Sequence, residues 1–236
     1  MSEDPMIDDL TSMLTRVVED NRDGIEASAQ AVAASGRDGG LLYAAGAGHS
    51  LAAVMETFFR AGGLAFVRPL WDQRVLPLAG ARASTAAERE AGLGQAVAER
   101  AGVGSQDTVL IFSNSGVNPY PVEIAQQGRR AGATVIAMTS VQASRTAPQR
   151  AEGRLFELSD IVLDTQVPAG DVTWPPSEPV TAPASTLVTA SLWTAILRRI
   201  DTIAPEVPRW KSANVAGTDE FNAALVERFA PRIPEL

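Results

Sequence analysis

The chain has 236 residues, of which 45% are hydrophobic and 20% charged, the balance of an ordinary globular protein and not of a disordered or fibrous one. Its formal net charge of −8 leaves no broad basic field for nucleic acid or for an anionic membrane surface. The absence of cysteine excludes disulfides and thiolate chemistry, and a single histidine leaves the usual clustered metal sites without ligands. We therefore expect no metal and no cofactor, although a metal held by carboxylates alone stays open.

The N-terminal part of the sequence predicts a helix and no targeting signal. Residues 1–5 are acidic where a secretory signal is basic, and no apolar run approaches the ~20 residues that span a bilayer. We expect a cytoplasmic protein with no membrane partner. Apolar residues recur at helical spacing from Ile7 to Val18 and predict an amphipathic helix, or a broken pair, over about residues 6–34 that ends near Gly36.

Five short apolar runs follow, and helical stretches separate most of them. The runs are 41–45, 65–67, 108–112, 134–138 and 161–164. Runs that are nearly continuous in apolar residues are typical of parallel strands covered on both faces, so we predict an α/β fold with a parallel sheet between helix layers. Residues 167–183 are rich in Pro, Gly, Ser and Thr and cannot form a helix, whereas 185–200 can. The chain is long enough for one large domain, and we predict a single domain over 1–236, with its core at about 36–203 and a C-terminal segment at 204–236.

Small polar residues follow three of the predicted strands. Ligands of open parallel sheets bind beyond the carboxyl ends of the strands, so these residues are the candidates for a binding site. They are Gly46, Ala47, Gly48, His49 and Ser50 after the first run, Ser113, Asn114, Ser115 and Gly116 after the third, and Thr139 and Ser140 after the fourth. The sequence therefore brings five hydroxyl groups to one edge of the sheet.

These loops have the chemistry of a phosphate site. Glycines let the backbone approach an anion, helices that begin there offer free N–H groups, and hydroxyls donate to phosphate oxygens. None of the loops contains Lys or Arg, which favours a small phosphate ester. Helix capping explains each hydroxyl singly but not their coincidence. Nucleotide binding is disfavoured because Leu51 stands where a dinucleotide fingerprint needs its third glycine, and no P-loop occurs.

These motifs resemble the sugar isomerase (SIS) domain, a phosphosugar-binding family. The shared pattern is a strand followed by Gly-x-Gly-x-Ser, a later strand followed by Ser-x-Ser-Gly, and a further strand followed by Thr-Ser. It runs from about residue 6 to residue 203. The segments GAGHS, METFFRAGGLAFVRPL, SNSGVNPYPVEIA, VIAMTS, VPAGD and SANVAGTDEFN are similar to a stand-alone subgroup, UPF0309, over nearly the whole chain.

The resemblance implies a flavodoxin-like three-layer sandwich with a five-stranded parallel sheet, assembled as a homodimer or homotetramer. It implies that a sugar phosphate is held by the serine-rich loops, with Ser50, Ser113, Ser115 and Thr139 or Ser140 on the phosphate. The common family pattern Ser-x-Ser-Gly-x-Thr-x-Glu is not kept, because Asn118 and Tyr120 occupy its last two marked positions. Asn118 can still donate a hydrogen bond, but the usual glutamate is absent.

Acid–base groups must then come from elsewhere near the loops. Glu56 lies six residues beyond Ser50 on the helix that leaves the loop, and is a candidate base for moving a proton between adjacent sugar carbons. The alternative is an i,i+4 ion pair with Arg60. His49, in the variable position of the glycine turn, is a candidate for contact with a sugar oxygen.

Two further acidic residues are weaker candidates. Asp171 follows the fifth run, and Glu220 lies in a polar stretch after Trp210; ordinary turn and cap chemistry is the alternative for both. We expect an aldose–ketose sugar-phosphate isomerase that uses acid–base catalysis. A non-catalytic phosphosugar sensor stays open, although no basic helix-turn-helix precedes residue 36, and so does a sugar-phosphate lyase or etherase.

Overall fold

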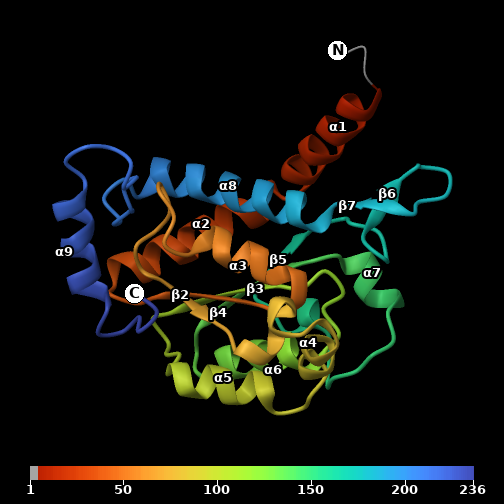
Figure 1. Cartoon of the computed structure of the whole chain (residues 1–236), viewed down its shortest axis with the longest axis horizontal. Coiled ribbons are helices and arrows are strands. Elements are labelled where there is room, and N and C mark those ends of the chain that lie inside the picture. The colour runs from red at the N-terminus through yellow and green to blue at the C-terminus, as the bar shows by residue number, and fades with distance from the viewer. Residues whose placement is uncertain (1–4) are drawn as a thin grey trace.

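The computed structural model describes residues 5–236 around a five-stranded parallel sheet with the strand order β2-β1-β3-β4-β5 (Figure 1). The strands are β1 (Leu42–Gly46), β2 (Val67–Leu70), β3 (Thr108–Phe112), β4 (Thr134–Thr139) and β5 (Ile161–Asp164). Every residue of β1 and β3 is buried, as expected of strands covered on both faces. This strand order is that of flavodoxin-like sheets, so the predicted fold class is confirmed.

Helices form a layer on each side of the sheet. On one face lie α2 (Arg22–Arg37), α3 (Leu51–Thr57) and α8 (Ser185–Ile203), and on the other lie α5 (Leu93–Ala101) and α6 (Pro119–Arg130) (Figure 1). The remaining helices are α1 (Pro5–Asp20), α4 (Ala81–Glu88), α7 (Val141–Thr146) and α9 (Asp219–Phe229), with short 3₁₀ turns η1 (Gly48–Ser50), η2 (Gln73–Val75), η3 (Pro77–Ala79) and η4 (Leu155–Glu157). The sheet is therefore the middle layer of three.

The N-terminal helix is a broken pair, one of the two predicted forms. The break falls at Asn21, whose side-chain Nδ2 donates to the carbonyl of Val17 at 2.7 Å and to the carbonyl of Asp164 at 2.9 Å. The amide of Asp164 donates back to Asn21 Oδ1 at 2.8 Å. The side chain thus ties the joint between α1 and α2 to the carboxyl end of β5.

The second strand lies further along the chain than the predicted 65–67. Backbone hydrogen bonds join residues 62–65 to 208–210 instead, ahead of the parallel ladder with β1. Because β2 is an edge strand, its ladder accommodates Arg68 and Pro69, which hide the strand from a search for apolar runs.

The long connection between β5 and α8 contains a hairpin that the sequence did not predict. Its strands are β6 (Val172–Trp174) and β7 (Thr181–Pro183), paired antiparallel. The prediction that residues 167–183 form no helix is confirmed, and α8 begins at the predicted Ser185.

The order in which the chain adds strands to the sheet reverses between β1 and β3. From β1 the chain continues to β2 on one side, and from β3 it continues to β4 on the other, so the loops that follow β1 and β3 diverge. In open α/β sheets the crevice at such a point is where ligands bind. Over residues 5–236, no helix is both long enough and apolar enough to cross a bilayer.

Candidate functional site

A cavity of about 430 Å³ lies at the carboxyl ends of β1 and β3. Its walls come from the two diverging loops, from α4, and from the segment that leads into α8. The lining residues are Ala47, Gly48, His49, Ser50, Pro77, Ala81, Ser84, Thr85, Glu88, Ser113, Asn114, Ser115, Asn118, Gly170, Asp171 and Ser185. Small-molecule sites typically measure about 300 to 1,000 Å³, so the cavity can hold a compact ligand.

The loop after β1 presents two unengaged polar side chains. Gly48 takes a φ of +60°, which glycine adopts without strain, and the chain then turns through η1 into α3. The ring of His49 is exposed and the hydroxyl of Ser50 is half-buried; neither has a hydrogen-bond partner in the described part of the chain. Both groups are free to meet a ligand.

The loop after β3 is fixed by hydrogen bonds to the rest of the chain and presents free hydroxyl groups to the cavity. Ser113 Oγ accepts from the amide of Gly116 at 3.2 Å, so its own proton remains available. Asn114 Oδ1 accepts from Thr165 Oγ1 at 2.8 Å, which fixes the side-chain amide. Ser115 lines the cavity, and its hydroxyl has no partner among the described residues. This loop therefore offers serine hydroxyls on a rigid support.

Thr139 and Ser140 do not line the cavity. Thr139 is fully buried and its Oγ1 donates to the carbonyl of Asn114 at 3.2 Å. Ser140 Oγ accepts from the amide of Ala143 at 3.2 Å and caps α7. Gly116 lies behind the loop as well, since a Cβ there would stand 2.8 Å from Thr139 Oγ1. The hydroxyls of Thr139 and Ser140 therefore bond to the backbone of the chain and do not face the cavity.

Asn118 closes the loop on the side of α6. It lines the cavity although it is nine-tenths buried. Its Oδ1 accepts from Arg150 Nη1 at 3.2 Å, which leaves the NH₂ group to donate to a ligand.

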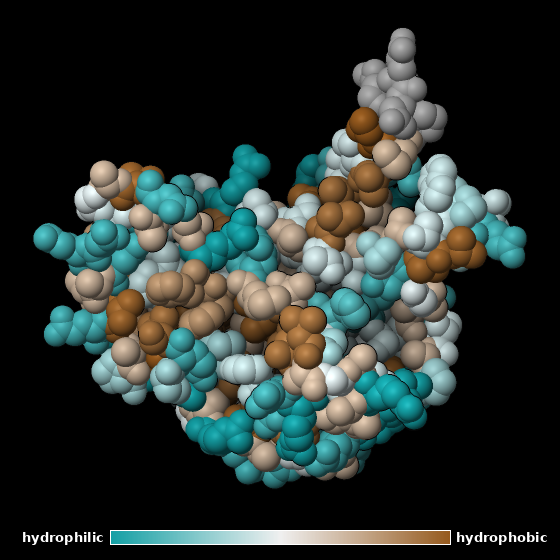
Figure 2. All heavy atoms as spheres, viewed as in Figure 1, coloured by the Kyte–Doolittle hydropathy of each residue, from teal (hydrophilic) through white to brown (hydrophobic). Residues whose placement is uncertain are grey.

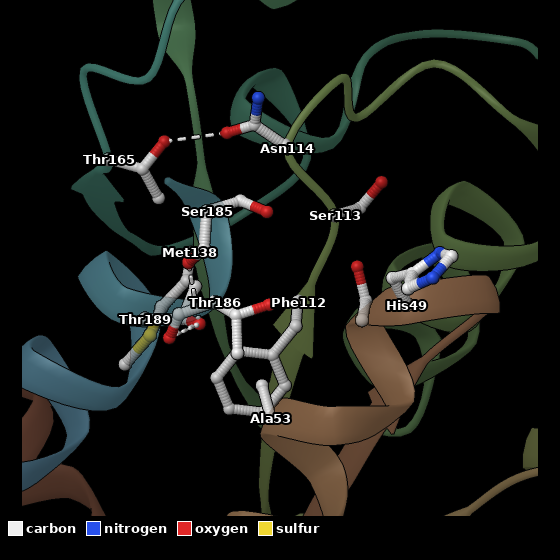
Figure 3. A pocket seen from close by; sticks show the side chains of 11 residues that line it. His49, Ala53, Phe112, Ser113, Asn114, Met138, Thr165, Ser185, Thr186 and Thr189 are labelled. Carbon is white, nitrogen blue, oxygen red and sulfur yellow. Dashed lines mark hydrogen bonds between the residues drawn. The ribbon is translucent and has the colours of Figure 1, made fainter. Parts of the chain in front are cut away.

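The start of α8 adds a wall that the sequence did not predict. Ser185, Thr186 and Thr189 meet Ser113 and Thr165 around a small pocket of about 10 Å³, beside the main cavity (Figure 3). That space holds about one water molecule. Thr165 directly follows the fifth predicted strand and was identifiable by the rule used for the other loops, whereas a long hairpin separates Ser185 from its strand.

The four predicted acid–base residues are placed very differently. His49 lines the cavity. Asp171 lines it too, but its oxygens are engaged: Oδ1 accepts from the amides of Ala184 and Ser185 at 3.1 and 2.8 Å, and Oδ2 accepts from Ser185 Oγ at 2.6 Å. It acts as the N-terminal cap of α8, the alternative foreseen for it.

Glu56 and Glu220 lie outside the cavity walls. Glu56 Oε2 accepts from Arg60 Nη1 at 2.7 Å, which is the i,i+4 ion pair that the sequence offered as the alternative. Glu220 is in the first turn of α9, beyond the C-terminal end of α8 and at the far end of the molecule from α7 (Figure 1).

The electrostatics of the cavity come from two carboxylates. Glu88 and Asp171 are the charged side chains among the residues of the described chain that line it, and no Lys or Arg joins them. Within residues 5–236, no group of three or more His, Asp or Glu side chains is placed to hold a metal ion. The polar surface otherwise consists of hydroxyls, amides and the His49 ring.

Comparison with known proteins gives concordant matches. The SIS domain family model matches residues 6–140. The UPF0309 protein of Streptomyces coelicolor is 38% identical over 237 residues, covering 96% of this chain and 94% of that protein. The solved phosphoheptose isomerase of Neisseria gonorrhoeae has a TM-score of 0.57 at 16% identity, covering 84% of this chain and 95% of the other. The Vibrio vulnificus NanR protein, solved in complex with ManNAc-6P, has a TM-score of 0.51 at 14% identity, covering 98% and 70%.

Proposed function

The chain belongs to the SIS-domain family and to its UPF0309 group, and from this premise we propose that it binds a phosphosugar in the cavity at the carboxyl ends of β1 and β3. One observation carries the proposal: Ser50, Ser113 and Ser115 converge from two diverging loops on a single cavity, each with a hydroxyl proton to donate. Capping accounts for hydroxyls such as that of Ser140, but none of these three hydroxyls forms a capping hydrogen bond, although Ser50 stands at the N-cap position of α3.

A phosphate monoester matches this set of donors. Its oxygens accept hydrogen bonds, and three serine hydroxyls with the NH₂ group of Asn118 supply them without a basic residue. Gly48 allows the backbone of the first loop to approach the ligand closely. The phosphate then lies on the loops, and the sugar extends toward His49 and α4.

The reaction we propose is an aldose–ketose isomerisation of the bound sugar phosphate. It needs groups that move protons between oxygen and carbon in the open-chain sugar, and such acid–base catalysis typically contributes about 10² to 10⁴ in rate. His49 lines the cavity with its ring unengaged and is placed to exchange a proton with a sugar oxygen. The similarity in fold to a phosphoheptose isomerase supports this reading.

A phosphosugar sensor without catalysis is the second candidate. The position of Glu56 outside the cavity favours it, and the similarity to NanR, whose solved complex holds ManNAc-6P, supports binding of a phosphosugar with or without turnover. An etherase would need the same base as an isomerase. Product analysis distinguishes the three: an isomer, no product, or an unsaturated sugar with a released acid.

The test is thermal stabilisation by glucose 6-phosphate, mannose 6-phosphate, ribose 5-phosphate and glucosamine 6-phosphate, each beside its unphosphorylated sugar. A ligand at about 100 times its Kd stabilises the folded state by about 2.7 kcal/mol, which for a chain of this size raises Tm by roughly 5 to 10 °C. We expect such a shift from at least one phosphate and none from the free sugars.

The Ser115→Ala variant should lose most of this shift, because the serine contributes a donor to the phosphate. Ser177→Ala is the matched control, since Ser177 is exposed in the β6–β7 hairpin and away from the cavity. If no phosphate stabilises the wild type, or if Ser115→Ala is stabilised as strongly as the control, the proposed site is wrong.

A further inference from the structure

One face of α4 lines the cavity, and its most reactive residue is Glu88. Ala81, Ser84, Thr85 and Glu88 recur at i, i+3, i+4 and i+7, so they share one side of the helix, and all four line the cavity. Ser84 is buried, and its Oγ donates to the carbonyl of Val75 at 2.9 Å, which fixes the rotation of α4 about its axis. Glu88 is thereby held toward the ligand space.

Glu88 is a half-buried carboxylate without a partner. Neither of its oxygens forms a hydrogen bond or ion pair with any residue of 5–236. The neighbouring acids are all engaged: Glu90 with Arg74 at 3.1 Å, Glu56 with Arg60 at 2.7 Å, and Asp171 with the start of α8. Of the two carboxylates that line the cavity, only Glu88 has oxygens free to accept a proton.

We propose that Glu88 is the general base that transfers a proton between C1 and C2 of the bound sugar phosphate. This inference rests on the proposed function. Glu88 removes the C2 proton of the open-chain aldose, the C–H electron pair becomes the C1–C2 double bond, and the carbonyl oxygen O1 takes a proton from the His49 imidazolium. Glu88 then returns its proton to C1 while the O2 hydroxyl gives its proton to His49, which leaves a ketone at C2.

The placement of the two groups fits this division of work. The turn η1, which carries His49, is in contact with α4, which carries Glu88, so the two side chains stand on adjoining walls of one cavity. The serine hydroxyls line the same cavity and would anchor the phosphate end. A carboxylate near a dianionic phosphate ester lowers the affinity for the ligand because like charges repel. The unpaired carboxylate of Glu88 therefore does not serve binding, and a role in the transition state explains its presence.

The experiment follows the exchange of the C2 proton for deuterium by ¹H NMR in D₂O, with the four aldose phosphates named above as probes. We expect wild-type protein to exchange the proton of the probe that stabilises it most. Glu88→Gln keeps the size of the side chain but removes the base, so the exchange rate should fall at least about 100-fold. Its Tm shift with the same probe should be equal to or larger than that of the wild type.

Two further variants complete the design. Glu88→Asp should recover part of the exchange, because a carboxylate is restored on a shorter side chain. Glu90→Gln is the matched control: Glu90 is two residues away, exposed and paired with Arg74, and its loss should leave exchange unchanged. The Tm of each unliganded variant verifies that it is folded.

Each contrary outcome points to a different failure. If no probe binds, the proposed function itself fails, and the role of Glu88 with it. If a probe binds but wild-type protein does not exchange C2–H, or if Glu88→Gln exchanges at the wild-type rate, Glu88 is not the base. If Glu88→Gln loses binding and exchange in equal proportion, Glu88 only recognises the sugar and the inference is overturned.

Discussion

His49 is the only histidine of the chain, and its ring stands exposed and unengaged at the mouth of the cavity. A single histidine gives a single pair of ring-proton signals, so NMR observes the site directly without assignment of the spectrum. We expect these signals to shift on addition of the aldose phosphate that most raises Tm, because the ring lines the cavity proposed to hold the sugar. Ring signals that stay in place at saturating ligand would remove His49 from the site.

A variant of His49 tests whether the ring acts in ligand binding or in catalysis. We expect His49→Asn to lower the rate of isomerisation less than Glu88→Gln does. Ring opening and proton exchange at oxygen still proceed slowly without a catalytic group, whereas removal of a carbon-bound proton requires the base. Steady-state kinetics on both variants, with direct measurement of ligand affinity, test this order. A His49→Asn defect confined to affinity would make the ring a binding group only.

Arg150 is placed to act on the proposed ligand through Asn118. Its Nη1 donates to Asn118 Oδ1 at 3.2 Å, which orients the amide with its NH₂ group free for the phosphate. We expect Arg150→Met to weaken phosphosugar binding by roughly 3- to 10-fold, the range expected for one misplaced hydrogen bond. Isothermal titration calorimetry measures the change, and Arg150→Lys should restore part of it.

The control for Arg150 is Arg145→Met. Arg145 carries the same charge on the nearby α7, but its guanidinium lies over the Phe156 ring at 5.7 Å and does not contact Asn118. A general effect of positive charge on an anionic ligand would weaken binding in both variants. An equal loss in the two would contradict the orienting role of Arg150.

Among single residues, the sequence identified those that directly follow a strand. Ser50, Ser113 and Ser115 were predictable as a group because the carboxyl ends of parallel strands share one edge. Glu88 was not, since it enters the cavity from α4, a helix whose placement depends on packing against η2 and η3. Ser185 was hidden by the hairpin between it and β5. Whether a hydroxyl lines the cavity or supports the loop, as Thr139 does, depends on side-chain direction, which spacing alone does not specify.

At the scale of elements, α8 depends on a cap that lies fourteen residues upstream. Asp171 accepts hydrogen bonds from the amides of Ala184 and Ser185 and from Ser185 Oγ, and it holds a φ of +66°. A helix N-terminus needs such acceptors for its free N–H groups and favours a negative charge beside them. The cap therefore both stabilises α8 and fixes the position of Ser185 in the cavity wall.

We expect Asp171→Ala to lower the free energy of unfolding by about 1 to 2 kcal/mol, the usual cost of losing an N-terminal cap. Asp171→Asn should cost less, because asparagine keeps one acceptor and tolerates positive φ. Urea denaturation gives both values. Asp201→Ala, at the exposed far end of α8, is the control and should change stability by no more than about 0.5 kcal/mol. A loss for Asp171→Ala that matches the control would show that α8 needs no cap.

The strands could be predicted from the sequence with different success. The central strands β3 and β4 have long apolar runs because both of their faces are buried, and they lie where predicted. The edge strand β2 was misplaced because Arg68 and Pro69 interrupt its apolar run, and a proline is tolerated there because β2 is at the edge of the sheet. The hairpin β6–β7 has no apolar alternation, since β7 is exposed throughout, and so gave no signal.

At the scale of the whole molecule, a hydrophobic surface lies next to the cavity. A groove of about 350 Å³ is lined mainly by apolar residues of α3 and of the segments around β2, and its lining residues Met55 and Trp71 are 65% and 38% exposed. Figure 2 shows hydrophobic residues gathered in the region where Figure 1 places α3. Exposed apolar patches of this kind are rare on monomers and typical of interaction surfaces. The striped helix α1, which extends from the body in Figure 1, adds a second such surface.

We predict that a second copy of the chain covers the groove lined by Met55 and Trp71, so that the protein is at least a homodimer. Static light scattering at micromolar concentration should give at least twice the 24.9 kDa of one chain. Each copy carries a formal net charge of −8, so association should strengthen as salt screens their repulsion, which is what an apolar contact between like-charged partners requires. Met55→Lys should shift the equilibrium toward monomer because it places a charge in the contact. Val215→Lys, on an exposed apolar residue that does not line this groove, should not. A monomeric wild-type mass at high salt would exclude the dimer, and dissociation by Val215→Lys but not by Met55→Lys would place the interface elsewhere.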